Sequence, residues 1–252
     1  MGWVDTHCHL QLDGRVPQEL MGRAESVDWM MVPGVDAASS AAAIALAEAH
    51  PDRLIASAGL HPHDAEFFDQ QWPALVDLMD RARAVGETGL DYYRNLAPPD
   101  AQRRSFQAHI DLAQERSFPI IVHCRDAFAD VHEMIGSSGA GHLSVLHCWT
   151  GGPKWTKRFV DLGVTFSFAG PVAFETGETV RLGAAQVPPG RAMVETDTPY
   201  LAPPPHRSEQ NEPAWVALVG AALAEVWGMD VEAVAASTTA RAVAVFGAPG
   251  SS

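Results

Sequence analysis

The sequence predicts an α/β protein folded as a single (β/α)8 barrel of the TIM type, with one domain spanning residues 1–252. Short apolar runs rich in Val, Ile, Leu and Met alternate with Ala-rich stretches of helical spacing, which is typical of parallel βαβ units. Eight such runs occur, and 252 residues is a common length for such a barrel. The alternation by itself also fits a doubly wound sheet, but eight apolar runs favour a sheet that closes into a barrel.

The predicted elements follow one another without a linker, a repeat or a low-complexity segment. Strands are predicted at the apolar runs, which cover residues 3–9, 29–32, 54–60, 84–87, 119–123, 143–147, 164–168 and 192–197. Helices are predicted at the stretches between and after them, at residues 37–49, 71–83, 101–117, 128–137, 154–162, 177–186, 213–227 and about 230–246.

The composition limits the classes of partner. Hydrophobic residues make up 47% of the chain and charged residues 19%, which indicates a folded domain with a sizeable core. The net charge is −14 and the only lysines are Lys154 and Lys157, so a basic surface that wraps nucleic acid is excluded. If the protein acts on nucleic acid, bound metal ions and a few arginines must hold it.

The sequence also favours a cytoplasmic protein. Three cysteines without a CxxC pattern do not form a disulfide framework, which indicates a reducing compartment. Neither a signal peptide nor an apolar run long enough to cross a bilayer is present, so we expect no membrane contact. A monomer is compatible with the sequence.

Side chains that can bind metal gather at the predicted carboxyl ends of five strands, where the active site of such a barrel lies. They are His7, His9, Glu87, His123, His147 and Asp197. Burying these groups together without a cation would be very costly. Nitrogen and oxygen ligands without sulfur suit Zn, Mn, Fe or Mg. We therefore predict a two-metal site in which one carboxylate bridges the ions and a shared water is activated.

Strand alternation predicts which neighbours share the barrel interior. Asp5 is expected there with His7 and His9, and Met193 and Glu195 are expected there with Asp197. The cysteines each follow a candidate ligand and are expected to point outward, as packing residues rather than nucleophiles. They are Cys8, Cys124 and Cys148.

Six motifs in this order closely resemble those of the TatD-type metal-dependent deoxyribonucleases, a branch of the amidohydrolase-like barrels. They are DTHCHL at 5–10, GLHPH at 59–63, GETGLDYY at 86–93, VHCRDA at 122–127, LHCWTG at 146–151 and ETDTPYL at 195–201. Each motif alone is weakly specific, whereas the ordered set is highly specific. The resemblance extends from residue 4 to about residue 246.

The resemblance implies a role for each site residue. One metal would be held by His7, His9 and Asp197, the other by His123 and His147, with Glu87 as the bridge. His61 and Glu195 would lie close by and shape the phosphate pocket or a proton path. Many relatives in the wider superfamily bridge their metals with a carboxylated lysine, and this sequence has Glu87 there instead.

One departure concerns the substrate. The family usually continues Arg-Gly-Lys-x-Asn-Glu-Pro after the eighth strand, and here HRSEQNEP at 206–213 keeps Arg207 but has Ser208 and Glu209 in place of Gly-Lys. Arg207 is expected to bind the substrate phosphate together with His61, and Glu209 is expected to weaken nucleic-acid binding. The alternative is that Arg207 forms a surface salt bridge to Glu209 or Glu212.

The favoured function is a divalent-metal-dependent phosphodiesterase, a deoxyribonuclease that acts like an exonuclease on DNA or another phosphodiester. It would use two ions, Zn, Mn or Mg, to activate water. An ester or amide hydrolase of the deacylase kind, using the same site, is the first alternative. A non-catalytic, metal-stabilised binding protein is the second, and turnover of labelled DNA or of an acyl substrate panel discriminates between the three.

Overall fold

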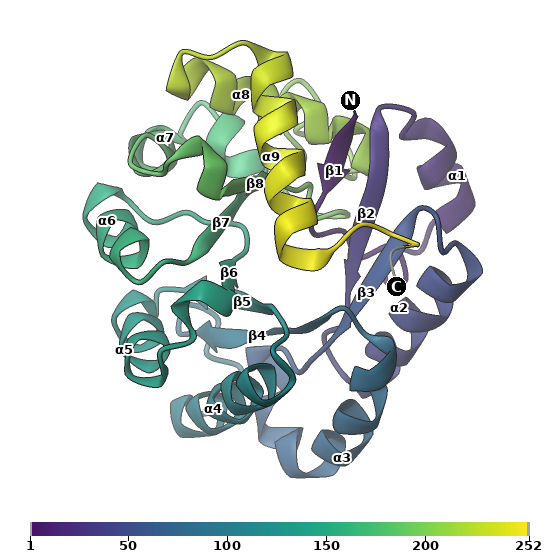
Figure 1. Ribbon diagram of the computed structural model, residues 1–252, viewed down its shortest axis with the longest axis vertical. Helices are drawn as coiled ribbons and strands as arrows, with labels where there is room; N and C mark the ends of the chain where they lie inside the picture. The colour runs from purple at the N-terminus through teal and green to yellow at the C-terminus, as the bar shows by residue number, and fades with distance from the viewer. Residues whose placement is uncertain (1, 251–252) are drawn as a thin grey trace.

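The computed structural model describes residues 2–250 and confirms the (β/α)8 barrel (Figure 1). The eight strands of this described part are parallel, and each pairs with the next along the chain. They are β1 (Trp3–Asp5), β2 (Val27–Pro33), β3 (Leu54–Ala58), β4 (Ala84–Asp91), β5 (Ile120–Arg125), β6 (Ser144–Leu146), β7 (Thr165–Phe168) and β8 (Ala192–Val194).

The α-helices surround the sheet (Figure 1). They are α1 (Pro17–Arg23), α2 (Ala37–Ala49), α3 (Phe68–Leu78), α4 (Pro99–Arg116), α5 (Phe128–Ser138), α6 (Pro153–Asp161), α7 (Glu178–Ala184), α8 (Val216–Trp227) and α9 (Val231–Phe246). Short 3-10 helices are η1 (Pro62–Phe67), η2 (Met79–Arg81), η3 (Ala140–Leu143), η4 (Gly170–Ala173), η5 (Pro189–Arg191) and η6 (Pro213–Trp215). Within residues 2–250 no single helix is long and apolar enough to span a membrane, and only α8 with η6 and α9, bent by 110°, pass that test as a pair.

The predicted helices are confirmed to within a few residues at their ends, whereas α1 was not predicted. It has seven residues, of which only Leu20 and Met21 are buried, and so it carries too little apolar periodicity to be recognised. The first and last strands are shorter than predicted, because β1 ends at Asp5 and β8 ends at Val194. In contrast, β4 continues beyond Glu87 to Asp91.

The barrel is closed by backbone hydrogen bonds at and beyond the ends of β1 and β8. The Thr6 N–H donates to Val194 O at 3.1 Å, the Asp197 N–H to His7 O at 2.9 Å, and the His9 N–H to Thr198 O at 2.8 Å. The two segments that close the barrel are therefore also the segments that carry three of the predicted ligands.

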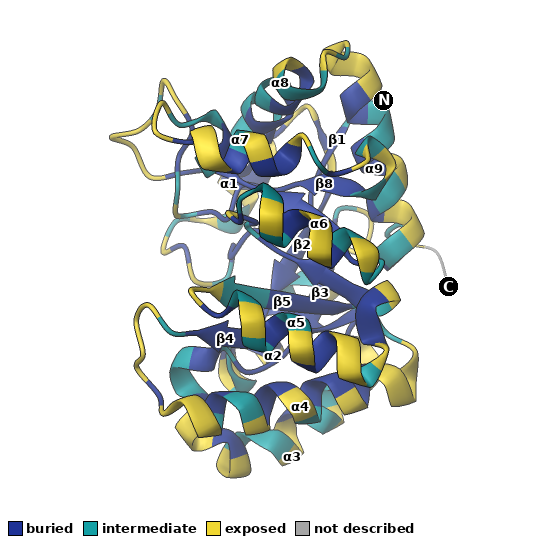
Figure 2. Cartoon of the chain, turned by 90° about the vertical axis from the view of Figure 1, so that its left-hand side faces the viewer, coloured by how far each residue is buried: buried dark blue, intermediate teal, exposed yellow. Residues whose placement is uncertain are grey.

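The core has an inner and an outer part. The outer part lies between the strands and the helices, whose outward faces are exposed (Figure 2). The inner part fills the barrel near the beginnings of the strands and includes Val4, Trp29, Met31, Ile55, Ile121, Val145 and Met193. Ala242 and Phe246 of α9 pack into this inner cluster, so α9 covers the amino-terminal end of the barrel and leaves the carboxyl ends of the strands for the site.

The predicted alternation along the first strand is wrong at Asp5. Its register partner on β2 belongs to the outer core, and its carboxylate accepts hydrogen bonds from the backbone N–H and hydroxyl of Thr196, at 2.9 and 2.6 Å. The chain then bends at Thr6. This bend shifts the alternation by one residue, so His7 and His9 face the site although Asp5 does not.

The strand β4 has an irregular path where it carries Glu87. Its register with β5 shifts between Val85 and Thr88, and Gly86 and Gly89 have φ angles of +126° and +136°. A Cβ at Gly89 would collide with the carbonyl oxygen of the neighbouring β5 residue. Glycine is thus required there both by the backbone angle and by the close approach of the two strands.

We predict that Gly89→Ala lowers the free energy of unfolding by about 2 to 5 kcal/mol, the combined effect of a strained φ and an overpacked contact. Denaturant unfolding of both variants and the wild type is the measurement. Gly22→Ala is the matched control, because the Cβ added at Gly22 in α1 would meet no atom within 4 Å beyond its chain neighbours and its own helix backbone. Equal midpoints for the two variants would show that β4 tolerates a side chain at residue 89.

Candidate metal centre

Glu87 is the centre of a cluster of histidines at the carboxyl ends of the strands. Its side chain is buried, and its two oxygens face different pairs of imidazoles. Oε2 lies 3.2 Å from His7 Nε2 and 3.6 Å from His9 Nε2. Oε1 lies 2.9 Å from His147 Nε2 and 3.1 Å from His123 Nδ1. One carboxylate therefore spans the two pairs.

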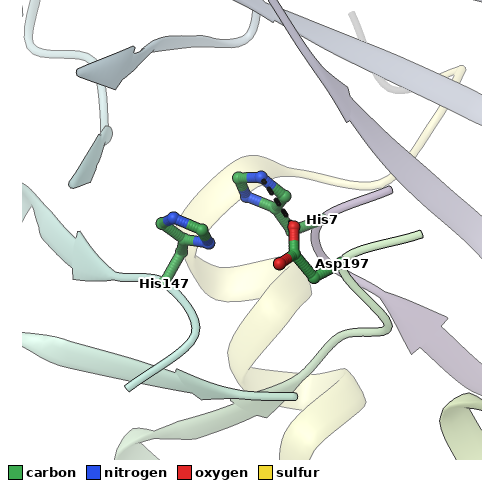
Figure 3. Close-up of side chains that lie close together, drawn as sticks. All are labelled: His7, His147 and Asp197. Carbon is green, nitrogen blue, oxygen red and sulfur yellow. Dashed lines mark ion pairs between the residues drawn. The ribbon is translucent and has the colours of Figure 1, made fainter. Parts of the chain in front are cut away.

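Asp197 completes the cluster on the side where the segments after β1 and β8 close the barrel. Its Oδ1 lies 3.9 Å from His7 Nε2 and 3.7 Å from His9 Nε2. Figure 3 shows the Asp197 carboxylate directed at His7, with the His147 ring beside them. The rings of His7 and His147 stack with their centroids 4.0 Å apart. The structure therefore brings all six predicted ligands together.

Three of the imidazoles around Glu87 are held by a hydrogen bond from the ring nitrogen that faces away from it. Such a bond fixes both the ring orientation and the tautomer, as it does in metal sites. The acceptors are Pro33 O for His9 at 3.3 Å, Asp91 Oδ2 for His123 at 3.0 Å and Glu195 Oε1 for His147 at 3.3 Å.

The donor set fits divalent cations. Burial lowers the pKa of His9 to about 3, so the ring is neutral. A carbonyl oxygen can only accept, so the His9 proton is on Nδ1 and an Nε2 lone pair faces Glu87 and Asp197. A lone pair and two carboxylates repel one another unless a cation lies between them. Three overlapping groups in this cluster have ligand atoms within 4.8 Å of one another.

Burial and mutual contact determine the charges in the cluster. Burial alone would raise the pKa of Glu87, but the surrounding imidazoles, above all His147, outweigh it and keep this pKa well below its usual range. Burial would lower the pKa of His147, but Glu87 and Glu195 raise it well above the usual value. For Asp197, burial dominates and raises the pKa to about 6.

His61 and Glu195 border the cluster. His61 Nε2 lies 3.4 Å from Glu87 Oε1, and its Nδ1 accepts the backbone N–H of His63 at 3.2 Å. Burial lowers the pKa of His61 to about 4, so the neutral ring carries its proton on Nε2 and acts as a donor there. Glu195 accepts the backbone N–H of Cys148 at 2.7 Å and therefore anchors His147 from behind.

Two residues of this network were not predicted as site residues, Asp91 and His63. Asp91 Oδ2 lies 3.0 Å from both His123 Nε2 and His63 Nε2. The buried amide of Gln102 accepts the Asp91 N–H at 2.8 Å and donates to Asp91 O at 3.2 Å. Strand alternation could have found Asp91, because residues 87 and 91 share a face once β4 is extended to residue 91.

Arg207 lies in the loop after β8, outside the histidine cluster. Its guanidinium covers the ring of Phe174 at 3.6 Å from the centroid and donates to Ala202 O at 2.9 Å. The two acidic residues considered as alternative partners bind elsewhere: Glu209 to His206 at 2.7 Å, and Glu212 to Arg23 at 2.7 Å. The surface salt bridge considered above for Arg207 is therefore not the arrangement that the structure shows.

The three cysteines are free thiols. Cys8 lies in the outer core and Cys124 packs against it, which agrees with the predicted outward orientation. Burial raises the pKa of Cys8, Cys124 and Cys148, so all three stay protonated and are poor nucleophiles.

Comparison with known proteins shows that this chain is similar to metal-dependent hydrolases. The family described as TatD related DNase matches residues 4–247. The chain is 33% identical to the uncharacterized metal-dependent hydrolase YabD of Bacillus subtilis, over 96% of this chain and 98% of that one. It is also 33% identical to the 3'-5' ssDNA/RNA exonuclease TatD of Pectobacterium parmentieri, over 90% and 91% of the two chains. The crystal structure of the TatD homologue YJJV from Escherichia coli superposes with a TM-score of 0.92 at 26% identity, over 98% of both chains.

We predict that divalent cations bind more weakly as the pH falls through about 6, because the predicted ligand Asp197 can bind a cation only as a carboxylate and its pKa is raised to about 6. Above that pH the carboxylate is available. Below it, protonation of this one group lowers the affinity about tenfold per pH unit. Titration calorimetry with Zn²⁺ between about pH 5 and 7.5 measures the slope. The Asp197→Asn variant should bind Zn²⁺ less tightly, and its affinity should depend on pH with a slope smaller by one proton. An unchanged slope would contradict the assignment of Asp197 as a ligand.

Proposed function

This chain belongs to the TatD related DNase family, and on that basis we propose that it is a divalent-metal-dependent phosphodiesterase that removes nucleotides from the end of a DNA strand. The Glu87 carboxylate carries the proposal, because each of its oxygens faces a separate pair of histidines. That arrangement suits a bridge between two cations, the kind of centre that serves in-line displacement at phosphorus.

The proposed ligand sets follow the two sides of Glu87. The first ion is assigned to His7, His9 and Asp197, and the second to His123 and His147, with Glu87 shared. Nitrogen and oxygen donors without sulfur suit Zn, Mn or Mg. When bound, two such ions lower the pKa of a shared water and neutralise charge that develops on the phosphate.

The chain's own groups have distinct roles in this proposal. Glu87 and Asp197 supply the negative charge that retains the cations. Glu195 orients His147 through Nδ1. His61 has its Nε2 proton directed into the cluster, where it can donate to a phosphate oxygen. These groups bind, orient and donate, and none of them forms a covalent bond with the substrate.

Nucleic acid is the substrate class that the relatives' names support. With a chain charge of −14, the phosphate backbone must be held locally rather than by a broad basic surface. The three free, protonated thiols fit a reducing compartment, so we assign the activity to the cytoplasm.

The purified protein should shorten end-labelled single-stranded DNA, and chelation should abolish this while the circular dichroism spectrum stays folded. The core rests on apolar packing rather than on metal, so the barrel survives metal removal. Readdition of Mn, Mg or Zn should restore turnover. Shortening of DNA by protein with no measurable metal would refute the metal mechanism. Turnover of an acyl panel instead of DNA would favour the ester or amide hydrolase.

In the same assay, Glu87→Gln should lower kcat by about 10²–10⁴, because the amide keeps the shape but removes the shared charge. His9→Ala should cost less, since His9 serves one ion only. Glu48→Gln is the matched control, because Glu48 is an exposed glutamate paired with Arg81 on the surface. A Glu87→Gln variant with near-normal kcat and two bound metals would show that the bridge lies elsewhere.

We predict that Arg207→Ala raises KM for short DNA by about tenfold and makes its salt dependence shallower by about one phosphate contact. The planar guanidinium suits phosphate oxygens and is held in place by Phe174. Glu209→Lys should act in the opposite direction, towards a lower KM and a steeper slope. Arg116→Ala is the control, because it removes a surface arginine at the end of α4 that pairs with Asp80 of η2. An unchanged KM and an unchanged salt dependence of KM in both variants would show that this loop does not contact the substrate phosphate.

A further inference from the structure

Tyr200 is a largely exposed aromatic residue beside the buried histidine cluster. Tyr200 lies three residues after Asp197 in the same turn, and 58% of the Tyr200 surface is exposed. The ring centroid lies 6.4 Å from that of His9, with the two planes at 69°. An aromatic face is thus available to solvent directly next to the position where the scissile phosphate would lie.

The loop that carries Tyr200 is held in place by hydrogen bonds to its backbone. The Tyr200 N–H donates to Asp197 O at 2.8 Å, and Tyr200 O accepts the side-chain amide of Asn211 at 2.6 Å. Asn211 is fully buried and also donates to Thr196 O at 2.7 Å. The guanidinium of Arg15 binds Asn211 O and ties the loop to the segment after β1. The backbone is therefore fixed, and it holds the ring out rather than letting it pack inward.

We propose that Tyr200 is the stacking platform for the terminal base of a single-stranded substrate whose phosphate lies on the Glu87 cluster. The proposal rests on the proposed function and assigns a recognition residue to it. Aromatic rings bind bases of any sequence by stacking, and an unpaired terminal base can turn onto such a ring because no partner strand holds it. Stacking of one base is expected to change the affinity by about 5- to 150-fold.

The charge of the chain makes such a contact valuable. With a net charge of −14, long-range attraction for the phosphate backbone is weak. A stacking contact is uncharged and therefore persists at high salt, whereas a contact to phosphate weakens. This difference separates the role of Tyr200 from that of Arg207.

A second exposed tyrosine on the same end of the barrel provides the comparison. Tyr93 is 62% exposed, but the Arg125 guanidinium lies over its ring at 4.0 Å from the centroid. One face of Tyr93 is thus already occupied. Tyr93→Ala removes an equally exposed ring that the proposal does not use, and it is the matched control.

The experiment measures KM for short single-stranded DNA with a normal end and with an abasic residue at either end, at low and high salt. Tyr200→Ala should raise KM about tenfold on the normal strand at both salt concentrations. Tyr200→Phe keeps the ring and should therefore have a KM close to that of the wild type. On the strand whose abasic residue occupies the site, the wild type should show the same raised KM, and Tyr200→Ala should add nothing further. Tyr93→Ala should behave as the wild type on every strand.

A binding measurement gives a readout independent of turnover. A strand with terminal 2-aminopurine and phosphorothioate linkages should lose fluorescence on binding to the wild type and much less on binding to Tyr200→Ala. Equal abasic penalties in the wild type and in Tyr200→Ala, or equal fluorescence changes, would overturn the stacking role while leaving the nuclease intact. A wild type that shortens no strand at all would overturn the proposed function, and this inference with it.

Discussion

The burial of the Glu87 carboxylate among five imidazoles is the constraint on which the rest of the site depends. A buried anion is costly unless opposite charge and hydrogen bonds compensate for it. Here Oε2 faces the ring nitrogens of two histidines and Oε1 those of three, and the far nitrogens of His9, His123 and His147 are anchored by Pro33, Asp91 and Glu195. The orientation of the imidazoles around Glu87 therefore depends on the acceptors behind them, and this orientation suits the binding of cations next to Glu87.

Barrel closure and ligand placement rely on the same hydrogen bonds. The regular strands β1 and β8 end before the ligands begin, and the chain segments beyond them pair through His7, His9 and Asp197 backbone groups. On the opposite side of the cluster, β4 deviates from regular pairing where it carries Glu87. Four of the candidate ligands, His7, His9, Glu87 and Asp197, thus lie where the sheet departs from regular strand pairing, and the hydrogen bonds that close the barrel also position three of them.

The acidic character of the chain limits how a polyanionic substrate can be held. A broad electrostatic surface is absent from a chain with two lysines and a net charge of −14. In the proposed function, local contacts supply the affinity: cations at the cluster, Arg207 supported by Phe174, and the exposed ring of Tyr200. Such a site favours a strand end, because an end offers both a reachable phosphate and an unpaired base.

The sequence alone determined the barrel and the six candidate ligands, because the carboxyl ends of parallel strands converge in such a barrel even when their predicted bounds are wrong by several residues. Only the tertiary structure decided which way Asp5 points, where β4 ends and that Asp91 and His63 join the network. It also showed that Asn211 braces the Tyr200 loop. The physical reason is that these features depend on a bend at Thr6, on glycine-dependent strand pairing and on hydrogen bonds between residues distant in sequence, and hydrophobic periodicity encodes none of them.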